Sequence, residues 1–120
     1  MTHDVRKFFG LDPFPFNGGQ TSFDNLWMGV PVISLEGDRF VSRMGMKYLK
    51  IFGLDEWIAQ THDQFIEIAV RMANALPELS KLRTQLRGRI QQSPLMDADR
   101  FTHNLESSYR KMWRKWCLQP

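Results

Sequence analysis

The opening third of the chain alternates strand-like and helix-like segments in an order that few folds accommodate. Phe8 to Phe16 is apolar with two prolines, which suits a short strand ending in a turn, and Asn17-Gly18-Gly19 directly after it is a strong breaker. A short helix is expected to begin at about Thr21. It should end before the next apolar run, because Gly29 and Pro31 supply a stop there. Val30 to Leu35 has the pattern of a strand covered on both faces. This βαβ order predicts an α/β fold with a short parallel sheet.

The rest of the chain has the periodicity of helices. They are predicted from about Arg39 to Phe52, from Thr61 to Leu76, from Pro77 to just before Ser93-Pro94, and from about Ala98 to Cys117. Thr61 and Gln64 form a capping box before an apolar face of helical period. Gly45 is expected to weaken the first of these helices by about 1 kcal/mol relative to alanine. We therefore expect a mostly helical second half.

The last predicted helix carries an apolar stripe with steps of four, four, three and four residues. Its members are Phe101, Leu105, Tyr109, Met112 and Trp116. These steps keep the side chains on one face, which we expect to be buried. Trp113 and Trp116 also suit docking against a neighbouring domain, or stacking on nucleic-acid bases.

Length and composition predict one folded domain over residues 1–120, since 42% of the residues are hydrophobic and 24% are charged. The single cysteine, Cys117, cannot form an intramolecular disulfide, which indicates a reducing compartment. The sequence contains no apolar run long enough to span a membrane, and its three histidines show no metal-ligand spacing. We therefore expect a cytoplasmic protein with no membrane partner and no bound metal.

The segment between the two predicted strands offers a site with a physical mechanism. Its glycines let the backbone approach a ligand, and the free N–H groups and dipole of a helix start suit a phosphate. Thr21 and Ser22 add hydroxyls, and Asp24, in the first helical turn, can accept hydrogen bonds from a ribose. The segment lacks a P-loop lysine and dinucleotide-motif spacing, so Asp24 is equally consistent with an acid that complements the helix dipole. The sequence leaves two roles open for Arg43, a contact to a phosphate and a structural ion pair.

A family resemblance becomes visible in the same segment. Residues 11–32, which include Leu11-Asp12-Pro13, Asn17-Gly18-Gly19-Gln20-Thr21-Ser22-Phe23-Asp24 and Gly29-Val30-Pro31-Val32, closely resemble the donor-site segment of the O-linked N-acetylglucosamine (O-GlcNAc) transferases. That family includes bacterial tetratricopeptide-repeat relatives and the plant SPINDLY proteins. Further similar segments follow in the same order, namely Ser42-Arg43, Gly53–Ala59, Leu82–Arg87, Ser93–Asp97 and Leu105–Trp113. The resemblance covers about 110 of the 120 residues.

The resemblance implies a partial Rossmann-like fold, the carboxyl-terminal, nucleotide-sugar-binding part of a GT-B glycosyltransferase. The full-length enzyme would transfer N-acetylglucosamine from UDP-N-acetylglucosamine to serine or threonine hydroxyls of proteins. By position, Gly19, Gln20 and Thr21 would contact the diphosphate and Asp24 the ribose. His3 and Arg6 match a His-x-x-Arg element that contacts UDP in the family. Animal members have histidine and threonine in place of Gly19 and Gln20, so backbone N–H groups would carry more of the phosphate binding here.

The resemblance also implies that this chain alone does not catalyse transfer. The sequence contains no candidate catalytic residue, because it offers no candidate base. In the family, a lysine contacts the leaving phosphate, and Lys7 of this sequence lies after the position of that lysine. Transfer needs a positioned donor and acceptor and charge stabilisation on the departing diphosphate. The expected partners are a UDP-sugar, the amino-terminal catalytic domain and tetratricopeptide repeats of the parent enzyme, and a protein acceptor. No metal or other cofactor is expected.

Two further functions stay open on the sequence. One is a non-catalytic interaction module, in which a degenerate donor domain docks a partner through a sheet edge and the basic final helix. The other is a nucleic-acid module, because the basic residues concentrate at the end of the sequence. Residues 81–120 include 9 basic and 3 acidic residues, whereas residues 1–80 include 7 basic and 10 acidic ones. These basic residues alternate with apolar ones as on a solvated helix face, so we expect no nucleic-acid partner.

Overall fold

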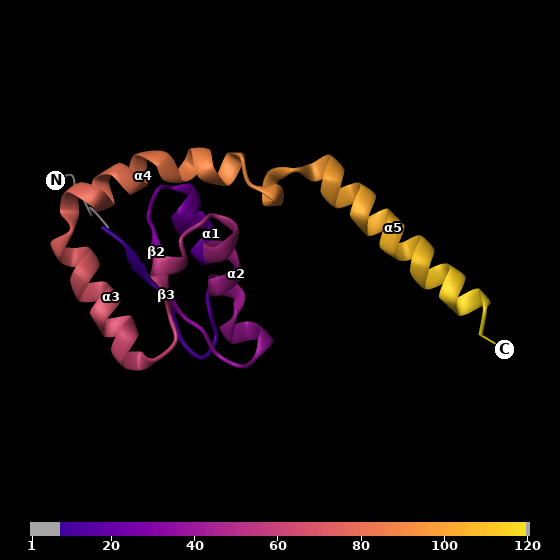
Figure 1. Cartoon of the computed structure of the whole chain (residues 1–120), viewed down its shortest axis with the longest axis horizontal. Coiled ribbons are helices and arrows are strands. Elements are labelled where there is room, and N and C mark those ends of the chain that lie inside the picture. Colours follow the sequence, from indigo (N-terminus) through magenta and orange to yellow (C-terminus); the bar gives the residue numbers. More distant parts are fainter. Residues whose placement is uncertain (1–7, 120) are drawn as a thin grey trace, which may run out of the picture.

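The computed structural model describes residues 8–119 (Figure 1). His3 and Arg6, the predicted contacts to UDP, lie outside the described residues. In chain order the strands and helices are β1 (Gly10–Leu11), α1 (Gln20–Trp27), β2 (Val32–Leu35), α2 (Met44–Ile51), β3 (Ile58–Ala59), α3 (His62–Asn74), α4 (Leu76–Gln91) and α5 (Ala98–Cys117). Short 3-10 helices are η1 (Phe40–Ser42), η2 (Asp55–Trp57) and η3 (Pro94–Met96). The predicted α/β alternation and the helical second half are both confirmed.

The strands form a three-stranded parallel sheet in the order β1-β2-β3. Gly10 pairs with Val32, and Ser34 pairs with Ile58. Parallel neighbours need a crossover connection, which α1 provides between β1 and β2 and α2 provides between β2 and β3. All four residues of the central strand β2 are buried, as its apolar sequence predicts. The predicted βαβ unit is therefore confirmed.

Strand β1 is shorter than the apolar segment that predicted it. Only Gly10–Leu11 of Phe8–Phe16 forms a strand. Asp12 still donates its N–H to the carbonyl of Ile33 at 2.9 Å, but two prolines follow within the next three residues. The donors to β2 are the alternate residues Gly10 and Asp12, so both prolines occupy positions that face away from it, where an edge strand tolerates proline. After Asp12 the chain leaves β2 and continues as a loop.

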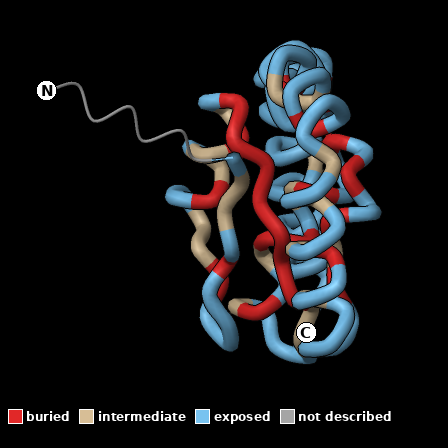
Figure 2. The backbone as a smooth tube through the Cα atoms, turned by 90° about the vertical axis from the view of Figure 1, so that its left-hand side faces the viewer, coloured by how far each residue is buried: buried red, intermediate tan, exposed pale blue. Residues whose placement is uncertain are grey.

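The core lies between the sheet and the helices on its two faces. In Figure 1, α3 lies on one side of the strands, α1 and α2 lie on the other, and α4 runs across one end of this body. Figure 2 shows the buried segments in red running through the middle of the body. Among the most completely buried side chains are Leu26, Ile33, Leu49, Leu54, Trp57, Leu86 and Ile90. Burying each large apolar side chain contributes about 1.5–3 kcal/mol, so this core is the main source of stability.

Helix α2 differs from its predicted form. The segment predicted to be helical from Arg39 begins as η1 and becomes α-helical only at Met44. Gly45, which we expected to weaken this helix, is buried, and a Cβ there would collide with the Asp12 carboxylate and the Ser34 hydroxyl. The absence of a side chain lets α2 approach the sheet closely, so this glycine has a packing role.

Helices α3 and α4 are confirmed close to their predicted bounds. The Thr61 hydroxyl caps α3 by accepting the N–H of Gln64 at 3.2 Å. Helix α4 packs against α1, and Arg83 Nε donates to the carbonyl oxygen of Gly29 at 3.0 Å. A cation near the carboxyl end of a helix complements its dipole, so α4 fixes the end of α1 that lies opposite the glycine turn.

Helix α5 has the predicted length but not the predicted burial. It extends away from the body after η3 (Figure 1), and all its residues except Ser107 are exposed. The exposed fractions of the predicted stripe are 65% for Phe101, 39% for Leu105, 59% for Tyr109, 57% for Met112 and 69% for Trp116. The prediction that this face is buried is therefore wrong within residues 8–119. Helical periodicity indicates that a helix has an apolar face, but that face is buried only where a second surface packs against it.

Candidate functional site

The carboxyl ends of the strands meet at one edge of the body. Asp12, Glu36 and Gln60 directly follow β1, β2 and β3. Because the strands are parallel, these residues share one edge, and open α/β sheets bind ligands outside that edge. Residues 19–24 lie in the connection after β1 and in the first turns of α1. The structure thus places the predicted site residues Gly19, Gln20, Thr21 and Asp24 at the edge where α/β folds bind ligands.

Gly19, Gln20 and Thr21 form the start of α1. Gly19 is the N-cap, with φ −81° and ψ −88°, and α1 has no side-chain capping hydrogen bond. The first N–H groups of a helix have no intrahelical acceptor, so they are available to an external one. A Cβ at Gly19 would meet nothing within 4 Å, which leaves open space beside this helix end. The structure therefore brings together the three residues that we predicted to contact a diphosphate.

Asp24 lies further along α1 than we expected. The helix begins at Gln20, so Asp24 is its fifth residue, and the first turn contains no acidic residue. The prediction of a first-turn position is wrong, and the reading of Asp24 as a dipole-complementing acid loses its support, because that effect fades beyond the first turn. The exposed Asp24 carboxylate accepts a hydrogen bond at Oδ1 from Gln20 Nε2 at 2.8 Å. The Gln20 side chain thus holds one oxygen of Asp24.

A buried carboxylate that we did not predict lies beneath the glycine turn. Asp12 is only 4% exposed, and its Oδ1 accepts the Gly18 N–H at 2.8 Å and the Ser22 hydroxyl at 2.9 Å. Its Oδ2 accepts the Ser34 hydroxyl at 2.8 Å. The sequence signal was an acid between an apolar strand and a glycine turn. Such a signal does not by itself predict burial, because acidic residues are rarely buried.

Asn17 supports the other side of the turn. This residue is 1% exposed, its Nδ2 donates to the Pro13 carbonyl at 3.0 Å, and its backbone N–H donates to the Val41 carbonyl at 3.0 Å. A Cβ at Gly18 would lie only 2.6 Å from the Ser22 hydroxyl oxygen. The turn therefore needs glycine at position 18 for close packing, which gives the Asn-Gly pair a structural role.

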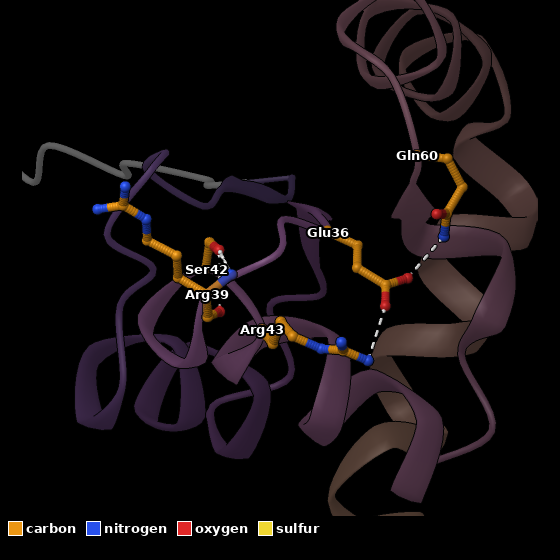
Figure 3. A network of polar contacts seen from close by, with 5 residues as sticks. All are labelled: Glu36, Arg39, Ser42, Arg43 and Gln60. Carbon is orange, nitrogen blue, oxygen red and sulfur yellow. Dashed lines mark hydrogen bonds and ion pairs between the residues drawn. The ribbon is translucent and has the colours of Figure 1, made fainter.

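Figure 3 shows a second polar network at the same edge, centred on Glu36. Glu36 pairs with Arg43 at 3.2 Å through Oε1, and its Oε2 accepts Gln60 Nε2 at 2.7 Å. Beside it, the Ser42 hydroxyl accepts the N–H of Arg39 at 3.2 Å and donates to the Arg39 carbonyl at 3.0 Å. Of the two roles left open for Arg43, the structure shows the ion pair. The network ties the loop after β2 to the residue after β3.

Two hollows of the body lie against α4, away from the glycine turn. One has a volume of about 380 Å³ and is lined by residues that include Trp57, Met72 and Leu79. The other, of about 510 Å³, is lined by residues that include Met28 and Arg83. Neither lining contains a predicted site residue. We therefore build the candidate site on the carboxyl edge, where the polar groups converge.

Two negative observations hold for residues 8–119. No three His, Cys, Asp or Glu side chains in this range are grouped as a metal site requires. No helix in the same range has both the length and the apolar character needed to cross a membrane. Cys117 is a free, exposed thiol at the end of α5.

Comparison with known sequences identifies a family. The profile described as "Glycosyl transferase family 41" matches residues 9–105. A Petunia hybrida protein named as a probable UDP-N-acetylglucosamine-peptide N-acetylglucosaminyltransferase SPINDLY is 41% identical over 122 residues, a match that covers 98% of this chain and 13% of the relative. A UDP-N-acetylglucosamine-peptide N-acetylglucosaminyltransferase of Caenorhabditis elegans is 28% identical, over 88% of this chain and 9% of its own length. The chain therefore spans only a small part of the length of these relatives.

A solved structure is similar in both sequence and fold. It is a mutant of the Thermobaculum terrenum O-GlcNAc transferase, with a TM-score of 0.83 and 38% identity, and the match covers 92% of this chain and 21% of that one. This likeness confirms the predicted fold class, a partial Rossmann-like unit of the GT-B carboxyl-terminal kind. The resemblance to O-GlcNAc transferases and SPINDLY proteins is confirmed as well.

Proposed function

Because the chain belongs to glycosyl transferase family 41, we propose that it is the UDP-N-acetylglucosamine-binding part of a protein O-GlcNAc transferase. The longer enzyme transfers the sugar to serine or threonine hydroxyls of proteins. The observation that carries the proposal is the start of α1, which has no side-chain cap and lies at the carboxyl edge of the parallel sheet. The names of the matched relatives support it, since one is named as a peptide N-acetylglucosaminyltransferase and the other as a probable one.

In this proposal the diphosphate of the donor binds at the start of α1. The backbone N–H groups of Gly19, Gln20 and Thr21 donate to its oxygens, and the helix dipole favours its negative charge. The exposed Thr21 hydroxyl adds a further donor. We propose that no metal or other cofactor takes part, because these donors complement the diphosphate charge directly.

The ribose binds to Asp24, whose carboxylate accepts hydrogen bonds from the two ribose hydroxyls. Gln20 Nε2 already donates to Oδ1 of this carboxylate at 2.8 Å. The Gln20 side chain therefore orients Asp24, while the backbone N–H of Gln20 serves the diphosphate. His3 and Arg6 stay predicted contacts to UDP.

We assign catalysis to residues of the longer protein, and α5 to contact with its amino-terminal catalytic domain. The matched relatives are much longer than this chain, which covers 13% of the Petunia protein. The exposed stripe runs along a helix of 20 residues, and a contiguous apolar face of this kind marks an interaction surface. Tetratricopeptide repeats and a protein acceptor complete the proposed set of partners.

We place the protein in the cytoplasm, where the exposed thiol of Cys117 stays reduced.

A titration with UDP, followed by NMR of the backbone amides, tests the donor site. We expect shifts in residues 18–24 and next to His3 and Arg6, and the loss of the shifts in residues 18–24 in Asp24→Ala. Asp99→Ala removes an exposed acid from the first turn of α5, far along the chain from the edge, and should leave the response unchanged. Amides at the start of α1 that do not respond to millimolar UDP in a folded sample would contradict the proposal.

The second candidate, a non-catalytic interaction module, draws support from the exposed stripe of α5. It predicts that a protein partner binds along α5 while UDP has no effect on residues 18–24. A nucleic-acid module predicts instead a steep loss of binding with salt, through the basic residues near the end of α5. The same titration, repeated with a protein partner and with RNA, separates the three functions.

A further inference from the structure

Asp12 is a buried acid that joins three elements of the candidate site. Its carboxylate accepts hydrogen bonds from the Gly18 N–H in the turn, the Ser22 hydroxyl on α1 and the Ser34 hydroxyl on β2, at 2.8–2.9 Å. Burying a carboxylate is unfavourable unless hydrogen bonds replace its lost water. At 4% exposure, Asp12 depends on these donors, so the turn, the helix and the strand hold fixed positions around it.

Glycines keep the space that this cluster occupies. A Cβ at Gly45 would collide with the Asp12 carboxylate and the Ser34 hydroxyl, and a Cβ at Gly18 would lie 2.6 Å from the Ser22 hydroxyl oxygen. Helix α2 and the turn can therefore close around the carboxylate only because these two positions have no side chain. The cluster is a packed part of the fold rather than a surface contact.

We propose that Asp12 is the positioning residue of the donor site. It draws the N–H of Gly18 inward, away from any ligand, and it ties the first turn of α1 to β2 through two serine hydroxyls. The N–H groups of the following residues, from Gly19 to Thr21, are thereby held in one orientation toward the diphosphate. This inference rests on the proposed function, because it assumes a diphosphate at those N–H groups. Asp12 lies beneath the turn and acts through it, so it is not a catalytic residue.

The Asp12 carboxylate has two opposing effects on an anion at the turn. Its negative charge repels the diphosphate, whereas its hydrogen bonds hold the binding N–H groups in place. Asparagine at this position separates the two effects. Its side-chain oxygen can accept from Gly18 and Ser22, and its amide can donate to the Ser34 hydroxyl, which accepts as well as donates. Alanine removes all three hydrogen bonds.

The experiment measures the dissociation constant for UDP and the hydrogen exchange of the Gly18 amide in the full chain and its variants. We expect Asp12→Ala to raise the dissociation constant about tenfold and to speed the exchange of Gly18. Asp12→Asn should restore the constant to within about threefold of the wild-type value, because position is kept and the repelling charge is gone. Ser22→Ala, which removes one hydrogen bond, should raise it about threefold, and it decides the question if Asp12→Ala does not fold.

Ser93→Ala is the matched control, because it removes another buried hydroxyl, which donates to the Ile90 carbonyl at 2.6 Å outside the site. It should lower stability without changing UDP binding. If the wild-type chain binds UDP and the Asp12→Ala and Ser22→Ala variants bind it equally well, the positioning role is overturned and the proposed function stands. A similar loss of binding in Ser93→Ala, or no recovery in Asp12→Asn, also overturns that role. A wild-type chain without any UDP response overturns the proposed function and this inference with it.

Discussion

Helices α4 and α5 are both long and carry apolar stripes, yet these stripes lie in opposite environments. On α4, Leu79, Leu86 and Ile90 are buried in the body. On α5, all residues except Ser107 are exposed, and the helix extends away from the body (Figure 1). An apolar stripe therefore indicates that a helix needs a partner surface, but it does not indicate where that surface lies. For α4 it is the body itself, and for α5 we propose the amino-terminal domain of the longer protein.

Truncating one leucine on each helix should give very different effects. Leu86 is 0% exposed, so Leu86→Ala leaves a cavity in the core and should lower the free energy of unfolding by about 2–5 kcal/mol. Leu105→Ala, on the exposed stripe of α5, should change it by less than about 0.5 kcal/mol. Urea unfolding of both variants, followed by circular dichroism, measures the difference. Equal losses would mean that α5 packs against the body in solution.

The contrast should disappear for α5 when its proposed partner is present. Adding the amino-terminal part of the longer protein should bury Trp116, and Trp116→Ala should weaken that association by about 2 kcal/mol or more. His103→Ala provides the control, because its position along the helix places it on the face opposite the stripe. A calorimetric titration gives both affinities. Identical affinities for the two variants would exclude the stripe as the contact surface.

Two glycines test how tightly the body packs. Gly45→Ala should destabilise the chain by about 1–3 kcal/mol, because its Cβ collides with Asp12 and Ser34. Gly88, on α4, would place a Cβ in open space, so Gly88→Ala should stabilise the chain by about 0.5–1 kcal/mol through helix propensity. Thermal unfolding measures both. Effects of the same sign would show that α2 does not approach the sheet as described.

Two ion pairs of equal length should make slightly different contributions to the free energy of unfolding. Glu36 and Arg43 are 3.2 Å apart in the body, where Glu36 also accepts from Gln60, while Glu106 and Arg110 are 3.2 Å apart on α5. Arg43→Gln should cost up to about 1 kcal/mol, and Arg110→Gln about 0.3–0.5 kcal/mol. Stability measured at low and high salt checks both values. A larger cost for Arg110→Gln would indicate that α5 makes tertiary contacts in solution.

Much of the fold was predictable because it depends on local signals. The apolar strand β2, the Asn17-Gly18-Gly19 turn and the Thr61 cap of α3 were each visible in a few neighbouring residues. Strand β1 is shorter than its apolar segment predicts, because the chain leaves β2 after Asp12, and no local pattern marks that point. The delayed start of α2 and the packing role of Gly45 were missed, since both depend on the approach of this segment to the sheet.

The sequence predicts the residues at the surface of the candidate site but not the buried residues that hold them in place. A glycine turn before a helix predicts free N–H groups, and the structure brings Gly19, Gln20 and Thr21 together there. Asp24 lies one residue further into the helix than expected, because α1 begins at Gln20 instead of about Thr21, and the exact first residue of a helix is hard to predict from sequence. Asp12 and Asn17 were not predicted, because polar residues in loops are normally solvated and only the fold shows that these two are buried.

From the sequence alone we obtained the order of strands and helices, the apolar faces and the family resemblance, because residue identities and short-range periodicity carry that information. The tertiary structure alone decided which of these faces meet. It buried the stripe of α4, left that of α5 exposed, and enclosed Asp12 among groups from β2, α1 and the glycine turn. Burial is a relation between segments that are distant in the chain, so no local pattern could specify it.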